Sequence, residues 1–84
     1  MIVDRLDFRF SEYYNEREVE QLLEELTSRG ASYGVVEGPN YHLDIPQNLD
    51  FTPFYQTLRD CESVAWVAAK TRIVVILKDI GIEG

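Results

Sequence analysis

The stretch ASYGVVEGPNYHLDIP, residues 31–46, decides the fold of this chain. Its first half is rich in β-branched and aromatic residues, and its second half alternates apolar with polar side chains, which is the period of a half-buried strand. Gly38-Pro39-Asn40 between the two halves is a turn signal. The stretch therefore predicts a β-hairpin that ends at Pro46. The apolar positions of its second strand are Tyr41, Leu43 and Ile45.

The residues before the hairpin predict a helix over residues 15–29. Asn15 followed by Glu18 has the pattern of a capping box, and Gly30 supplies a C-terminal stop. Between them, apolar residues recur at helical spacing. These are Val19, Leu22, Leu23 and Leu26.

Further toward the N-terminus, Leu6, Phe8 and Phe10 alternate with charged residues, which predicts another half-buried strand. On the other side of the hairpin, Asp50 or Thr52 can cap a second helix, whose first turn tolerates Pro53 because its missing N–H is not needed there.

The end of this second helix is ambiguous in the sequence. An apolar stripe favours one long helix to about residue 70. Its members are Phe54, Leu58, Cys61, Ala65 and Ala68. The alternative is that residues 62–70 are extended, since Val64, Trp66 and Val67 also suit a strand. In both cases residues 73–78 predict a strand that is apolar on both faces.

The order strand, helix, strand, strand, helix, strand predicts an α+β fold, the ferredoxin-like βαββαβ plait, as a single domain over residues 1–84. An additional C-terminal strand is a variant of this fold. We expect an antiparallel sheet with the first and third strands in the middle and both helices on one face. The apolar residues of those two strands then face the helices.

Composition excludes several functional classes. The 84 residues carry a formal net charge of −7, a field that repels nucleic-acid backbones, so direct nucleic-acid binding is not expected. No apolar run approaches the length of a membrane span, and the first residues do not resemble a signal peptide, so we expect a cytoplasmic protein without membrane contact. Cys61 is the single cysteine and is expected to be a buried structural thiol. With one histidine and scattered carboxylates, neither a metal nor another cofactor is predicted.

A row of acids on the first helix is the strongest candidate binding surface. Glu16, Glu20 and Glu24 recur at i, i+4 spacing, where like charges repel. Glu16 is favoured by the helix N-terminus, but Glu24 lies near the C-terminal end, where the helix dipole opposes it, so helix stability does not explain part of this acidity. The row is either a surface for a basic protein partner, approached by electrostatic steering, or a solvated face that serves solubility.

The open face of the sheet is the second candidate. Its polar cluster comprises Arg5, Asp7, Arg9, His42 and Asp44. A histidine beside a carboxylate can act as a general base, and arginines can hold an anion. The favoured interpretation is a solvated or interface face, since alternating charges across two strands stabilise a sheet. The cluster lacks the aromatic platform of sheet-face RNA modules.

Other apolar residues leave the oligomeric state open. Val74 and Ile76 would lie uncovered on the open face unless another chain or a further segment covers them, so a homodimer is one expectation. Several aromatic residues can serve either an interface or the edge of the core. They are Tyr13, Tyr14, Phe51, Tyr55 and Trp66.

Three functional hypotheses follow. The first is a small acidic, non-enzymatic interaction or regulatory module, such as an inhibitor or adaptor of a basic protein. The second is a homodimeric domain that senses a small molecule. The third is a small enzyme that uses His42 and Asp44 on the sheet face.

Overall fold

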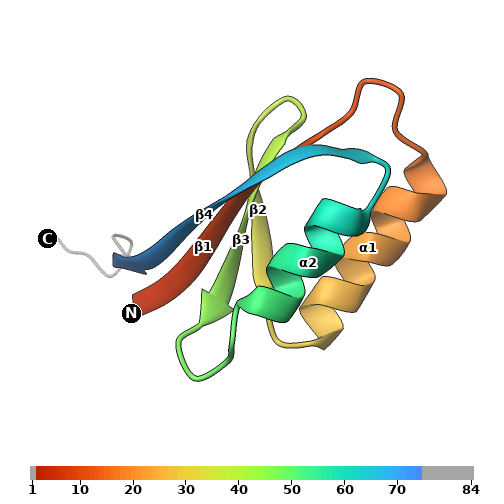
Figure 1. Cartoon of the computed structure of the whole chain (residues 1–84). Helices are drawn as coiled ribbons and strands as arrows, with labels where there is room; N and C mark the ends of the chain where they lie inside the picture. Colours follow the sequence, from red (N-terminus) through yellow and green to blue (C-terminus); the bar gives the residue numbers. More distant parts are fainter. Residues whose placement is uncertain (1, 75–84) are drawn as a thin grey trace, which may run out of the picture.

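The computed structural model describes residues 2–74, and its elements follow the predicted order (Figure 1). They are β1 (Ile2–Phe10), α1 (Glu16–Ser28), β2 (Ser32–Glu37), β3 (Asn40–Pro46), α2 (Thr52–Asp60) and β4 (Val64–Val74). This is the ferredoxin-like plait that the sequence predicts.

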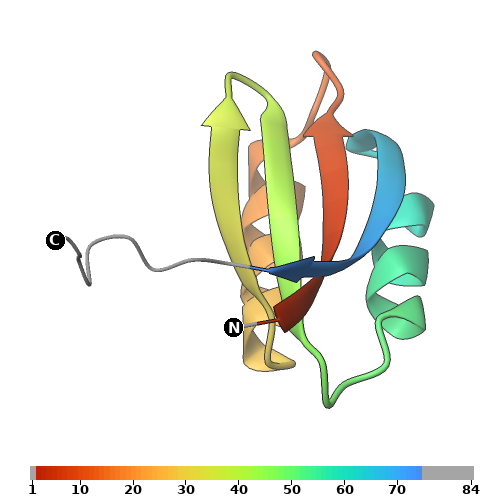
Figure 2. The ribbon, with the colours of Figure 1, turned by 90° about the vertical axis from the view of Figure 1, so that its left-hand side faces the viewer.

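The sheet has the strand order β2-β3-β1-β4, and every neighbouring pair is antiparallel. β1 lies in the middle, where Leu6 is opposite Leu43 of β3 on one side and Ala69 of β4 on the other. Both helices cover the same face, and Figure 2 shows the opposite face of the sheet with the helices behind it. The predicted arrangement of strands and helices is confirmed.

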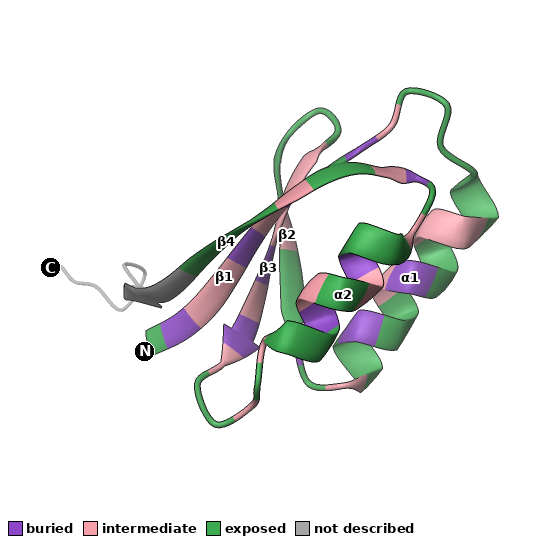
Figure 3. Ribbon diagram, viewed as in Figure 1, coloured by how far each residue is buried: buried purple, intermediate pink, exposed green. Residues whose placement is uncertain are grey.

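The core lies between the sheet and the helices (Figure 3). The alternation in β1 and β3 predicts its centre correctly, because Leu6, Phe8, Leu43 and Ile45 are all fully buried. The helices contribute Leu22, Leu26, Phe54 and Leu58.

Helix α1 begins as its sequence predicts. The side chain of Asn15 accepts a hydrogen bond from the backbone N–H of Glu18 at 3.0 Å. The reciprocal half of the capping box is relayed through another residue. Buried Ser63 accepts a hydrogen bond from the N–H of Asn15 and donates one to the Glu18 carboxylate. At the other end, Gly30 adopts φ 107°, a conformation that favours glycine.

The prediction of one long helix to about residue 70 is wrong. Helix α2 ends at Asp60, and Cys61 is already extended, with φ −81° and ψ 125°. From Val64 the chain pairs with β1, which places Val67 against the core. Local helical spacing gives way here to sheet pairing and burial. The predicted strand over residues 73–78 enters β4 with its first two residues, and residues 75–78 lie outside those described, as does any additional C-terminal strand.

Candidate functional site

The structure places the acid row, Glu16, Glu20 and Glu24, on the exposed side of α1. The neighbouring acids of the helix have partners: Glu25 forms an ion pair with Arg29 at 3.1 Å, and Glu18 accepts its hydrogen bond from Ser63. Among the described residues, no cation lies within 4.0 Å of a carboxylate of the acid row. The row is thus the uncompensated part of the helix.

Beside the acid row runs a hollow surface between α1 and the hairpin of β2 and β3. One part has a volume of about 460 Å³, and a second part of about 230 Å³ shares Glu20 and Leu23 with it. We call this surface the α1 groove. The first part is lined by Phe10, Tyr14, Glu16, Val19, Glu20, Leu23, Gly38, Pro39 and Tyr41. The second adds Glu24, Thr27 and Tyr33.

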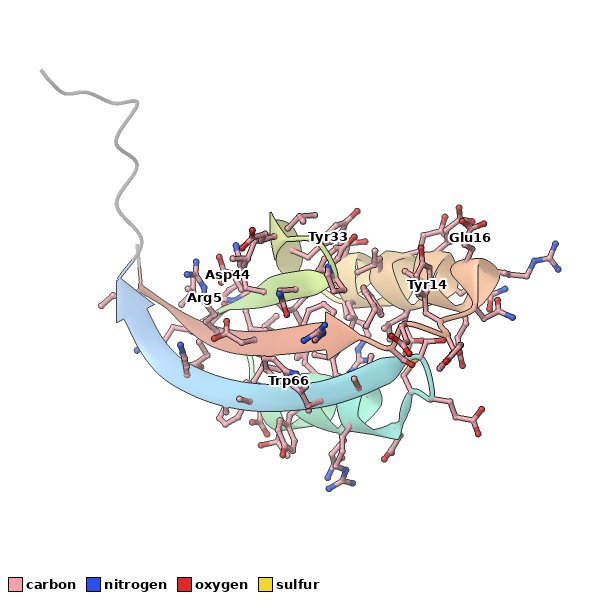
Figure 4. All side chains as sticks on the ribbon, turned by 90° about the horizontal axis from the view of Figure 1, so that it is seen from above. Arg5, Tyr14, Glu16, Tyr33, Asp44 and Trp66 are labelled. Atoms are coloured by element: carbon pink, nitrogen blue, oxygen red, sulfur yellow. The ribbon has the colours of Figure 1, made fainter. Side chains whose placement is uncertain are left out.

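Aromatic rings connect the two parts of the α1 groove. The centre of the Phe10 ring lies 6.2 Å from the centre of the Tyr14 ring and 5.0 Å from that of the Tyr41 ring. The centres of the Tyr41 and Tyr33 rings lie 6.1 Å apart. Figure 4 shows Tyr14, Glu16 and Tyr33 on the side of the molecule that carries α1 and β2. Apolar rings therefore lie next to uncompensated carboxylates, a combination suited to ligands that are both apolar and cationic.

The other aromatic residues singled out in the sequence lie apart from the groove. Phe51 and Tyr55 pack against the core, whereas Tyr13 is 87% exposed in the connection after β1. Trp66 is 46% exposed and lies opposite Arg9 in the sheet register. Of these five, only Tyr14 belongs to the α1 groove.

On the open face of the sheet, ion pairs link the predicted polar residues. Arg5 binds Asp44 in a bidentate manner, with distances of 2.6 and 2.9 Å, and this hydrogen bonding raises the pKa of the guanidinium. Asp7 pairs with Lys70 at 3.0 Å. The structure brings His42 and Asp44 together but leaves Arg9 without a described ion pair.

His42 has little catalytic support in this arrangement. Its Nδ1 is buried without a hydrogen-bond partner and lies 3.4 Å from the Asp44 carboxylate, which is held by Arg5. A Cβ atom on Gly34 would come within 2.6 Å of the His42 ring, so the imidazole packs closely against Gly34 of β2. Neither His42 nor Asp44 lines the groove described above. General-base catalysis needs a concave site that excludes water.

Two expectations based on single residues have different outcomes. Cys61, expected to be buried, is only half-buried at the end of α2, where it packs against the core, and this burial raises the pKa of the thiol. The homodimer expectation depends on the side chains of Val74 and Ile76, which lie outside the described part of the structure. Homodimerisation stays a prediction.

The sequence did not reveal the α1 groove. Tyr41, an expected core residue, does pack against the core, but it also lines the groove. Tyr33 and Val35 are 43% and 58% exposed, although they alternate toward the helix side of β2. The one sequence signal for the groove was the presence of apolar residues on β2, a terminal strand of the sheet. Helix α1 covers only part of β2, so these residues stay partly exposed.

Within residues 2–74, no helix is long and apolar enough to span a bilayer. The same residues contain no group of three or more His, Cys, Asp and Glu side chains placed to hold a metal ion. Comparisons with protein-family models, curated proteins and solved structures found no match for this chain.

Proposed function

We propose that this protein is a non-enzymatic interaction module of the cytoplasm that binds a basic segment of another protein and acts as an inhibitor, adaptor or regulator of it. The observation that carries this proposal is the uncompensated acid row along an apolar groove. A solvated face needs the charges but not the groove, and a hydrophobic dimer interface needs the groove but not the charges.

Physical chemistry gives each part of the α1 groove a role in binding. The tyrosine rings offer apolar contact area and faces that attract cations. The carboxylates accelerate the encounter with a basic partner and orient it. Lysine and arginine side chains match both features, since their stems cover apolar surface while their charged ends reach carboxylates.

The test is affinity capture from lysate of the native host with the wild-type protein and with a variant in which Glu16, Glu20 and Glu24 are changed to Gln. The expected result is a basic protein that the wild type binds at low salt and releases at high salt, and that the variant does not capture. Capture of the same proteins by both forms would contradict the proposal.

A matched control separates position from total charge. Glu12, Asp60 and Glu62 are exposed and lie away from the α1 groove, so neutralising them changes the net charge by the same amount, from −7 to −4. This variant is expected to retain the partner. If it loses the partner as fully as the acid-row variant, net charge and not the groove determines binding.

A further inference from the structure

The outer edge of β2 lies next to the α1 groove and is open for pairing. β2 is the terminal strand of the sheet and pairs only with β3 among the described residues. Native proteins protect such edges with lysine, proline or bulges. β2 has neither lysine nor proline, and its register shift falls between Val35 and Glu37, which leaves the backbone of residues 32–35 regular.

The side chains of this edge strand are incompletely covered on the side of the helices. Tyr33 lies opposite Leu43 and Val35 opposite Tyr41, so both point toward the layer of α1, yet they are 43% and 58% exposed. Tyr33 also shares its part of the groove with Glu20. A chain lying along β2 would therefore contact backbone, apolar side chains and carboxylates together.

We propose that the partner segment binds in extended form and adds a strand to the sheet along residues 32–35 of β2. Arginine or lysine occupies every second position of this segment, where its stem lies over Tyr33 and Val35 and its charged end reaches Glu20 and Glu24. Backbone hydrogen bonds supply affinity, and the alternating side chains supply specificity. This inference rests on the proposed function and specifies how the groove recognises its partner.

A basic segment fits this edge better than a second copy of the chain. Two-fold pairing of β2 with β2 of another copy would extend the sheet and place both α1 helices on the same face, next to the junction. The acid rows of the two copies would then face each other without cations between them. Like charges in such a position oppose association.

The first test uses three peptides of the same length as β2, 6 residues. In the first, arginine and threonine alternate. The second has the same composition, with all arginines before all threonines. The third repeats the alternating order with all of its backbone amides N-methylated, which removes the hydrogen-bond donors that face β2 without changing charge. The alternating peptide is expected to bind at low salt, and each of the other two is expected to bind at least about tenfold more weakly.

Hydrogen exchange supplies a readout that charge alone does not give. The alternating peptide is expected to protect the outward-facing amides among residues 32–35, every second one, because an added strand accepts their hydrogen bonds while the intervening amides already bond β3. Val35→Lys should weaken binding, since it places a cation in the path of the arginines. Tyr13→Lys, at an 87% exposed position, makes the same change of charge elsewhere and should have little effect.

Failure of this inference is distinguishable from failure of the proposed function. If the three peptides bind equally well and Glu20→Gln weakens all of them, the groove binds cations but no strand is added. If none of them binds while capture still depends on the acid row, the partner is recognised in another conformation. A protein that is dimeric by light scattering, with the outward-facing amides of residues 32–35 already protected from exchange, would assign the edge to a second copy and overturn the inference.

Discussion

Replacing Glu20 by Gln should make the protein more stable and its groove a weaker cation binder. Glu20 lies one turn from both Glu16 and Glu24 on α1, so it takes part in both like-charge pairs of the acid row. Each i, i+4 pair of like charges costs about 0.2–0.5 kcal/mol, and removing both should stabilise the protein by about 0.4–1 kcal/mol. Glutamine has nearly the same helix propensity and shape, so little else changes.

Thermal and urea unfolding measure this gain. For a chain of this size the expected rise in Tm is about 2–8 °C at low ionic strength. The gain should shrink as salt screens the exposed charges. Binding of the alternating arginine peptide, measured with the same sample, should weaken.

Glu25→Gln is the matched control for this experiment. It also removes one carboxylate from α1, but Glu25 pairs with Arg29 at 3.1 Å in an exposed i, i+4 ion pair. Its loss should destabilise the protein by about 0.3–0.5 kcal/mol. If Glu20→Gln is instead neutral or destabilising at low salt, the acid row is not electrostatically unfavourable, and the argument that it exists for a partner fails.

Three further outcomes test other parts of the structure. Ser63→Ala should lower the unfolding free energy by about 1–3 kcal/mol in urea titrations, because it removes a buried hydroxyl that both accepts and donates a hydrogen bond at the start of α1; an unchanged midpoint would contradict that role. Asp44→Ala should lower the free energy of unfolding by about 1–2 kcal/mol, because it leaves the guanidinium of Arg5 without its bidentate partner. Asp7→Ala loses a more exposed ion pair and should lower it by about 0–1 kcal/mol; equal losses for the two variants would contradict this difference. The raised pKa of the Cys61 thiol means that folding favours the protonated form, so its contribution to stability is complete below the pKa of the unfolded thiol and is lost as pH rises through the higher folded value. Alkylation of Cys61 at neutral pH should therefore be slower in the native protein than in urea. Equal rates would argue against burial of the thiol.

The parts of the fold with strong local signals were predictable. The hairpin has a turn between two extended segments, and α1 has its cap, apolar stripe and glycine stop within a few residues of one another. Residues 62–70 lack such a boundary, because no glycine or proline separates α2 from β4. There the outcome depends on pairing with β1, a partner distant in sequence, which single-sequence patterns do not encode.

The candidate site was predictable only in its charges. The spacing of Glu16, Glu20 and Glu24 gives their common side of the helix. The apolar half of the α1 groove requires the hairpin to lie next to α1 with part of β2 uncovered. That offset is a property of how the layers pack, so Tyr33 and Tyr41 appeared in the sequence as ordinary strand residues.

The central position of β1 governs the order in which this chain can assemble. As the chain leaves the ribosome, β1 emerges before either neighbour, and its last described partner, Val74, pairs with Ile2. The start of α1 likewise waits for Ser63. The helices and the hairpin can form from nearby contacts and β1 can pair with β3, whereas β1 gains its second neighbour only when β4 is made. Until then the edge of β1 that pairs with β4 is open to strands of other chains. The sheet is complete only after nearly all of the described residues have been synthesised.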